Sequence, residues 1–127
     1  MLLRLFNWLM RRRLGKEMTP ARVIYTRLPG LLWRTLPMYH LLERGLGLER
    51  SLRHLIEVRV SVLNGCTFCE DLHRANAALE GPEQTPALDG TSRDERYDAR
   101  QRAALRYVEE IAQGGVSDAG FEQLRSQ

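Results

Sequence analysis

Apolar residues recur along the chain at the three- and four-residue spacing of α-helices, and turn signals divide them into segments. The pattern predicts helical segments at residues 2–14, 19–28, 31–44, 48–63, 66–80 and 94–113 and from about residue 119 onward. Pro37 is expected to kink the third segment or to begin a fresh turn there. We therefore predict an all-α bundle of about six or seven helices.

The segment 48–63 is the one whose secondary structure the pattern leaves open. Residues 56–62 alternate between apolar and polar side chains, which is typical of a half-buried strand. Leu52, Leu55 and Leu63 also trace one face of a helix. A strand leading into a CxxC helix would indicate a thioredoxin-like fold, which needs further strands after the motif. Residues 82–92 read as a loop and no later strand pattern follows, so we predict a helix.

Residues 1–18 form a basic amphipathic segment at the N-terminus, with its helix at residues 2–14. Residues 1–35 carry eight basic side chains against Glu17 alone. A basic amphipathic helix can lie on a membrane surface. We favour the alternative that this helix packs on the core or on a neighbouring subunit.

Composition narrows the class of protein. A chain of 127 residues and 14.7 kDa has the size of one domain, residues 1–127. The net charge of +3 is small for a nucleic-acid-binding protein, so no nucleic-acid partner is expected. No run of eighteen apolar residues occurs, so no transmembrane segment is expected. The two cysteines stand in one CxxC motif, which fits the reducing cytoplasm better than a secreted disulfide scaffold.

The candidate chemistry lies in Cys66, Cys69 and His73, which follow the turn signal Asn64-Gly65. On a helix these three side chains fall within roughly 60° of one another. Cys66 is expected in the first turn, where free backbone N–H groups and the helix dipole favour a thiolate. His73 comes one turn after Cys69, close enough to exchange a proton with it. The pattern indicates redox or nucleophilic chemistry.

Other interpretations of the motif remain open. The cysteines could be structural thiols or form a static disulfide across a very short loop. Cys66, Cys69 and His73 could also bind zinc, with His54 as a fourth ligand. We favour redox cycling and expect neither a metal nor a cofactor.

Residues 54–75 resemble the signature of the AhpD-like alkylhydroperoxidases of the carboxymuconolactone decarboxylase superfamily. The resemblance is specific over about residues 48–80, which include the CxxC motif and His73. The resemblance implies an all-α fold that assembles as homotrimers or homohexamers and reduces peroxides. Cys69 would attack the peroxide and become a sulfenic acid, and Cys66 would resolve it as a disulfide. A dithiol reductant of the lipoyl or thioredoxin type would then reduce the disulfide.

The chain departs from the family pattern in two ways. Family members usually carry a glutamate twelve residues before the first cysteine, where it orients the histidine, and this chain has His54 there. The expected catalytic set is therefore Cys66, Cys69, His73 and His54, with Glu57 as an alternative support for His73. The family also continues through another helix, so the final helix of this chain is expected to be shortened.

Two other classes of function stay open. The decarboxylase branch of the superfamily acts on a lactone of aromatic catabolism, but it typically lacks the CxxC pair. A non-enzymatic redox-sensing or metal-binding module would keep the cysteines without a peroxide pocket.

Overall fold

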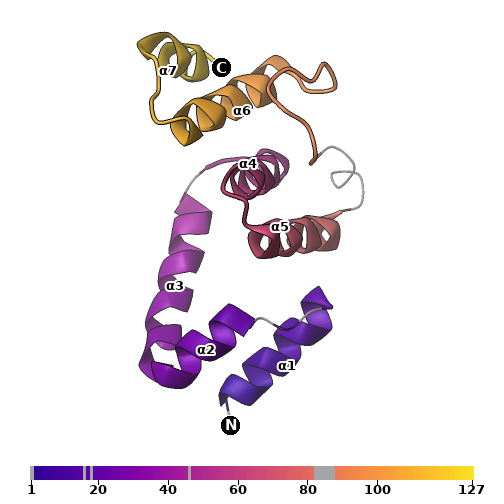
Figure 1. The fold of residues 1–127 in the computed structure, drawn as a ribbon, viewed down its shortest axis with the longest axis vertical. Coiled ribbons are helices and arrows are strands. Elements are labelled where there is room, and N and C mark those ends of the chain that lie inside the picture. The colour runs from indigo at the N-terminus through magenta and orange to yellow at the C-terminus, as the bar shows by residue number, and fades with distance from the viewer. Residues whose placement is uncertain (1, 16, 18, 46, 82–87) are drawn as a thin grey trace. The chain divides into compact units, whose positions relative to one another are not determined.

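The chain is all-α. The computed structural model describes residues 2–15, 17, 19–45, 47–81 and 88–127, and these residues form seven helices and no strand (Figure 1). This confirms the predicted fold class. The helices are α1 Leu2–Leu14, α2 Thr19–Arg27, α3 Pro29–Gly45, α4 Arg50–Leu63, α5 Thr67–Glu80, α6 Ala99–Ala112 and α7 Asp118–Arg125.

Two compact units make up the chain, Met1–Gly47 and Leu48–Gln127. The assignment of residues 1–127 to one domain stays a prediction. The second unit has a core that joins α4, α5, α6 and the turns before α6. Its buried apolar side chains are Leu52, Leu55, Val58, Ala77, Leu88, Tyr97, Ala104 and Leu105.

Helix α4 confirms the helical interpretation of residues 48–63. Leu52, Leu55 and Val58 are buried, and their spacing of three residues marks one helix face. Val60 and Val62, which an alternating strand would bury with Val58, are 38% and 43% exposed. Burial thus follows the helical period because α4 packs against both α5 and α6.

Helix α6 begins later than predicted. The helix expected from residue 94 starts at Ala99, because Asp98 and Gln101 form a reciprocal capping box. Tyr97 therefore precedes the helix, and its hydroxyl accepts a hydrogen bond of 3.0 Å from the Gly90 backbone N–H. Ile111, in the last turn of α6, is 53% exposed.

The remaining boundaries agree more closely with the sequence. Helix α3 starts at Pro29 rather than at residue 31, and it continues through Pro37, so Pro37 does not begin a new helix. Ser117 caps α7 by accepting a hydrogen bond from the Gly120 backbone N–H, and the helix starts at Asp118, close to the predicted start at about residue 119. Of the predicted loop 82–92, residues 82–87 lie outside the described residues, and turns follow from Leu88.

The first unit consists of α1, α2 and α3. Phe6 of α1 packs edge-on against Tyr25 of α2, with ring centroids 6.4 Å apart. The Tyr25 hydroxyl lies 3.3 Å from Thr35 Oγ1 of α3. Trp8 and Trp33 are both more than half exposed.

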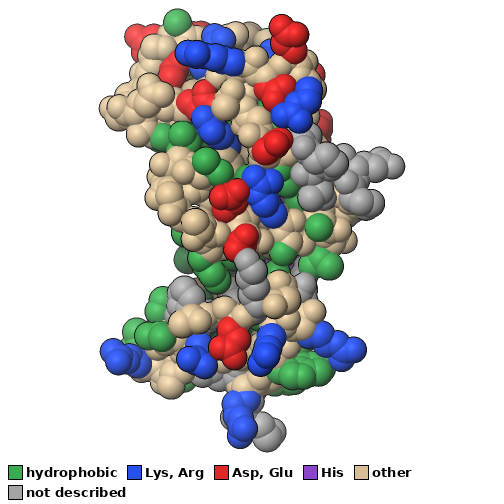
Figure 2. All heavy atoms as spheres, turned by 45° about the vertical axis from the view of Figure 1, so that its right-hand side comes forward, with side chains coloured by type: hydrophobic (Ala, Val, Ile, Leu, Met, Phe, Trp, Pro, Cys, Tyr) green, Lys and Arg blue, Asp and Glu red, His purple; other side chains and the backbone are tan. Residues whose placement is uncertain are grey.

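Charge is distributed unequally between the two units. Residues 1–47 hold nine Lys and Arg against two Glu, a net charge of +7, whereas residues 48–127 hold ten basic against fourteen acidic residues, a net charge of −4. Among the charged side chains seen in the space-filling view, those of the first unit are mostly basic, and those of the second are of both signs (Figure 2). No helix in the described part of the chain is long and apolar enough to cross a membrane.

Candidate functional site

The turn between α4 and α5 places the two cysteines. Asn64 and Gly65 follow the last residue of α4, and Gly65 has a φ of 63°, a conformation that favours glycine. The Cys66 backbone N–H donates a hydrogen bond of 2.9 Å to the Ser61 carbonyl oxygen. Cys66 is the capping residue directly before α5, which starts at Thr67, one residue later than the predicted start at residue 66.

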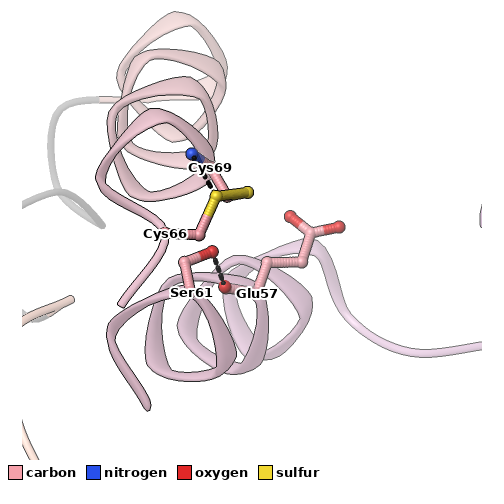
Figure 3. Close-up of a disulfide and its surroundings, with 4 residues drawn as sticks. All are labelled: Glu57, Ser61, Cys66 and Cys69. Atoms are coloured by element: carbon pink, nitrogen blue, oxygen red, sulfur yellow. Dashed lines mark hydrogen bonds between the residues drawn. A yellow bond between two sulfur atoms is a disulfide. The ribbon is translucent and has the colours of Figure 1, made fainter. Parts of the chain in front are cut away.

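Cys66 and Cys69 form a disulfide, with their Cα atoms 5.3 Å apart (Figure 3). The Cys69 backbone N–H donates a hydrogen bond of 3.2 Å to Cys66 Sγ, so this sulfur serves as the side-chain cap of α5. The pair is therefore built into the helix start rather than added to a loop.

Two histidines meet at one carboxylate oxygen. Glu57 Oε2 on α4 lies 3.2 Å from His54 Nδ1 on the same helix and 3.1 Å from His73 Nδ1 on α5. The contact with His54 has hydrogen-bond geometry. The contact with His73 has the distance of an ion pair, but its N–H direction is not aligned with the oxygen. The structure thus brings the predicted residues His54 and His73 together through Glu57.

The three side chains differ in burial. His54 is buried at 2% exposure, whereas the side chains of Glu57 and His73 are 21% and 19% exposed. Glu57 extends from α4 on the side where the disulfide lies (Figure 3). The cluster is therefore anchored in the core at His54 and reaches solvent at His73.

The electrostatics of Glu57 favour its ionised form. Burial alone raises the pKa of this carboxyl group, but the contact with His73, and then that with His54, outweigh burial and hold the pKa below its ordinary value of 4.5. Arg53 Nε, 3.9 Å from Glu57 Oε1, adds another positive group on α4. At neutral pH Glu57 is thus a carboxylate that can hold the two imidazoles in place.

Ser61 is a supporting residue that the sequence reasoning missed. Its hydroxyl donates a hydrogen bond of 2.7 Å to the Glu57 carbonyl oxygen, while its own carbonyl accepts the hydrogen bond from Cys66 (Figure 3). Ser61 therefore links the helical turn that carries Glu57 to the turn that carries the cysteines. The four-residue spacing from Glu57 to Ser61 is the only signal for it in the sequence.

The structure gives no support to the zinc interpretation of the motif. Within the described ranges, no three His, Cys, Asp or Glu side chains form a group that could hold a metal ion. His40, the third histidine, is exposed on α3 in the first unit.

Comparisons with known proteins point to one family. The model of the "Carboxymuconolactone decarboxylase family" matches residues 29–110, which include both cysteines and all three histidines. The chain is also 35% identical over 66 residues to "Uncharacterized protein YdfG" of Bacillus subtilis (strain 168). That match spans 50% of this chain and 45% of the relative, so the chain covers less than half of that protein. No solved structure matches the chain.

Replacing Glu57 by Gln is expected to change how folding stability depends on pH. Since the folded state lowers the pKa of Glu57, its contribution to stability is present above about pH 4.5 and is lost as pH falls below that value. The Glu57→Gln variant should be less stable than the wild type by about 1–3 kcal/mol at neutral pH. It should also lose less stability between about pH 5 and pH 3, because glutamine does not titrate. Urea unfolding across this pH range measures both effects.

The matched control is Glu122→Gln, because the Glu122 side chain is 66% exposed and its ion pair with Arg125 is 3.7 Å long. This control should follow the wild-type pH dependence. If Glu57→Gln also follows it, Glu57 does not hold the two imidazoles in solution.

Proposed function

The chain belongs to the carboxymuconolactone decarboxylase family, and from that membership we propose that it is a thiol-dependent peroxidase of the AhpD-like type. The single observation that carries this proposal is the Cys66–Cys69 disulfide at the start of α5, one helical turn before a histidine that contacts a carboxylate. The substrate is hydrogen peroxide or an organic peroxide, and the co-reactant is a dithiol of the lipoyl or thioredoxin type.

The oxidative half of the cycle converts two thiols into a disulfide. The Cys69 thiolate attacks one peroxide oxygen, an S–O bond forms, the O–O bond breaks, and the leaving alkoxide or hydroxide takes a proton. The Cys66 thiolate then attacks the sulfur of the sulfenic acid, and the S–S bond forms as the sulfenic oxygen leaves with a proton as water. The spacing of the two cysteines on α5 supports this second step, because their Cα atoms are 5.3 Å apart.

His73 is the proton donor in this scheme. It follows Cys69 by four residues on α5, so the two side chains lie on the same face of the helix. Glu57 holds His73 and takes over the orienting part that the family resemblance gives to a carboxylate at the position of His54. His54 is buried and its Nδ1 contacts Glu57 Oε2, so it positions Glu57 from the core side.

The need for a dithiol donor also favours one cellular compartment for the protein. A peroxidase of this kind needs a reducing environment to regenerate its thiols, so we place it in the cytoplasm as part of the proposal.

The decarboxylase function named in the family description is the second candidate. That branch of the superfamily typically lacks the CxxC pair, so the decarboxylation would leave the two cysteines without a role. The disulfide favours the redox reaction over the decarboxylation.

The direct test is peroxide consumption with dihydrolipoamide or reduced thioredoxin as the donor. The wild type should turn over, and one equivalent of peroxide should remove both thiols together in a thiol titration. The Cys69→Ser variant should fall to background, because it lacks the attacking sulfur. The Cys66→Ser variant should be oxidised once, to a sulfenic acid that dimedone traps, and should then stop.

Stoichiometric zinc in the purified protein, combined with no peroxide consumption, would contradict the enzyme and favour a metal-binding module. Circular dichroism of each variant establishes that the helices are intact.

The second test concerns the proton relay. The His73→Gln variant should lose about 10²-fold or more in the rate of peroxide reduction, since it lacks the proton donor. Glu57→Gln should cost less than His73→Gln, and His54→Gln least, because each acts through the next residue. The pH–rate profile should change with Glu57→Gln, an effect that a purely structural role would not give.

His40→Gln is the matched histidine control, since His40 is exposed and lies in the other unit. Its rate should equal that of the wild type. A normal rate for Glu57→Gln together with an inactive His54→Gln would show that His54 itself serves His73.

We also propose that the protein assembles as a homotrimer or homohexamer. The first unit exposes many large apolar side chains, among them Trp8, Trp33, Leu41 and Leu42, at 54%, 56%, 71% and 60%. Patches of this kind favour a protein interface. The opposite net charges of the two units favour contact between unlike units of two copies. Light scattering at micromolar concentration should return a trimer or a hexamer, and a monomer throughout would contradict the assembly.

A further inference from the structure

The two sulfur atoms of the disulfide lie in different surroundings. Cys66 Sγ accepts a hydrogen bond of 3.2 Å from the Cys69 backbone N–H at the start of α5. For Cys69 Sγ, no N–H or O–H donor is found in the described part of the chain. The two ends of the disulfide therefore differ, because Cys66 Sγ already has an N–H donor that would stabilise negative charge on it.

Helix geometry strengthens this difference. Cys66 precedes the first residue of a 14-residue helix, where backbone N–H groups lack partners and the dipole is positive. A thiolate is stabilised there, as in other cysteines at helix N-termini. Cys69, three residues on, lies within the helix and gives its own N–H to Cys66.

Two of the neighbouring carboxylates are paired with positive groups or imidazoles. Glu70 lies in the first turn of α5, and its carboxylate forms an ion pair of 2.9 Å with Arg74. Glu57 is held by His54, His73 and Arg53. The negative charge of these two groups is thus partly offset before it reaches the cysteines.

We propose that the dithiol donor attacks Cys69 Sγ and that Cys66 is the sulfur that leaves. This inference rests on the proposed function for the presence of a dithiol donor. In thiol–disulfide exchange the sulfur that forms the more stable thiolate is the better leaving group. The donor thiolate forms a new S–S bond to Cys69, the Cys66–Cys69 bond breaks, and its electron pair stays on Cys66 as a thiolate. The donor's second thiolate then attacks the donor's own bound sulfur, so the donor leaves as a cyclic or closed disulfide and Cys69 leaves as a thiolate.

This order gives Cys66 the role of the thiolate in both halves of the cycle. Once Cys69 has attacked the peroxide, its sulfur is the one that is attacked, first as a sulfenic acid and then as half of a disulfide. Cys66 is the thiolate that attacks in the first case and departs in the second. The Cys69 thiolate is released last, one turn before His73, in the state that the next peroxide requires.

The same geometry selects for a dithiol over a monothiol. After the first exchange the Cys66 thiolate stays beside the mixed disulfide, since the two Cα atoms are 5.3 Å apart. It can attack Cys69 again and expel the donor. A donor with a second thiol next to the first competes with this reversal, whereas a monothiol must wait for a second molecule.

The test maps the sulfur that a small thiol attacks. The oxidised wild type is mixed briefly with 2-mercaptoethanol, quenched in acid, and alkylated with N-ethylmaleimide. Trypsin releases residues 60–74 as one peptide that contains both cysteines. Tandem mass spectrometry then locates the mercaptoethanol and the maleimide. We expect mercaptoethanol on Cys69 and maleimide on Cys66 in about two- to fivefold excess over the reverse product, as a helix-terminus effect of ordinary size gives.

Equal amounts of the two products, or an excess of the reverse one, would overturn the proposal. A second measurement uses the single-cysteine variants Cys69→Ser and Cys66→Ser, alkylated with iodoacetamide at neutral pH. The Cys66 thiol of the first variant should react about two- to fivefold faster than the Cys69 thiol of the second, and an equal or slower rate also counts against it. Neither experiment uses peroxide. The proposed peroxidase function can therefore fail while this assignment of the leaving sulfur holds, and the assignment can fail while the peroxidase function holds.

Discussion

The contact on which the site depends is the one between a single carboxylate oxygen of Glu57 and two imidazoles. A partly buried carboxylate is unfavourable unless polar partners replace the water it loses. His54 supplies that partner from within α4, and His73 supplies it from α5. The interaction therefore couples the side-chain geometry of the site to the packing of the two helices. Any shift of α5 along α4 would separate His73 from Glu57 and move the cysteines with it.

Glu57 places a carboxylate against His73, although the position that the family pattern gives to a glutamate holds His54 in this chain. The resemblance places a carboxylate twelve residues before the first cysteine, where this chain has His54. Glu57 comes three residues later, which on a helix is close to one full turn and the same face. In this chain the carboxylate thus lies about one turn closer to the cysteines than in the family pattern, and an imidazole stands at the position of the family's glutamate. Because both side chains share the face that meets α5, the contact with His73 survives the exchange.

Much of this could be predicted from the sequence, and the reasons for the failures are specific. The turn at Asn64-Gly65 and the start of α7 near residue 119 depend on local chemistry, so the sequence predicts them. The start of α6 was predicted too early, because Tyr97 joins the hydrophobic core from the turns before the helix, where its hydroxyl accepts a hydrogen bond from Gly90. The contact of Glu57 with His73 depends on how α4 and α5 are aligned. Sequence spacing within one helix does not contain that information, so Glu57 was only an alternative to His54.

The residues of the candidate site and the exposed apolar side chains are concentrated in different units. Cys66, Cys69, His73, His54 and Glu57 all lie in the unit Leu48–Gln127, as do the disulfide and the two contacts of Glu57 with the imidazoles. The unit Met1–Gly47 contributes none of these residues, yet it carries a net charge of +7 and exposes the large apolar side chains of α1 and α3. Exposed apolar side chains favour a protein interface, and the surrounding charge favours a partner surface of opposite sign. In the proposed function α4 and α5 hold the reactive residues, and in the proposed assembly α1, α2 and α3 supply contacts between copies.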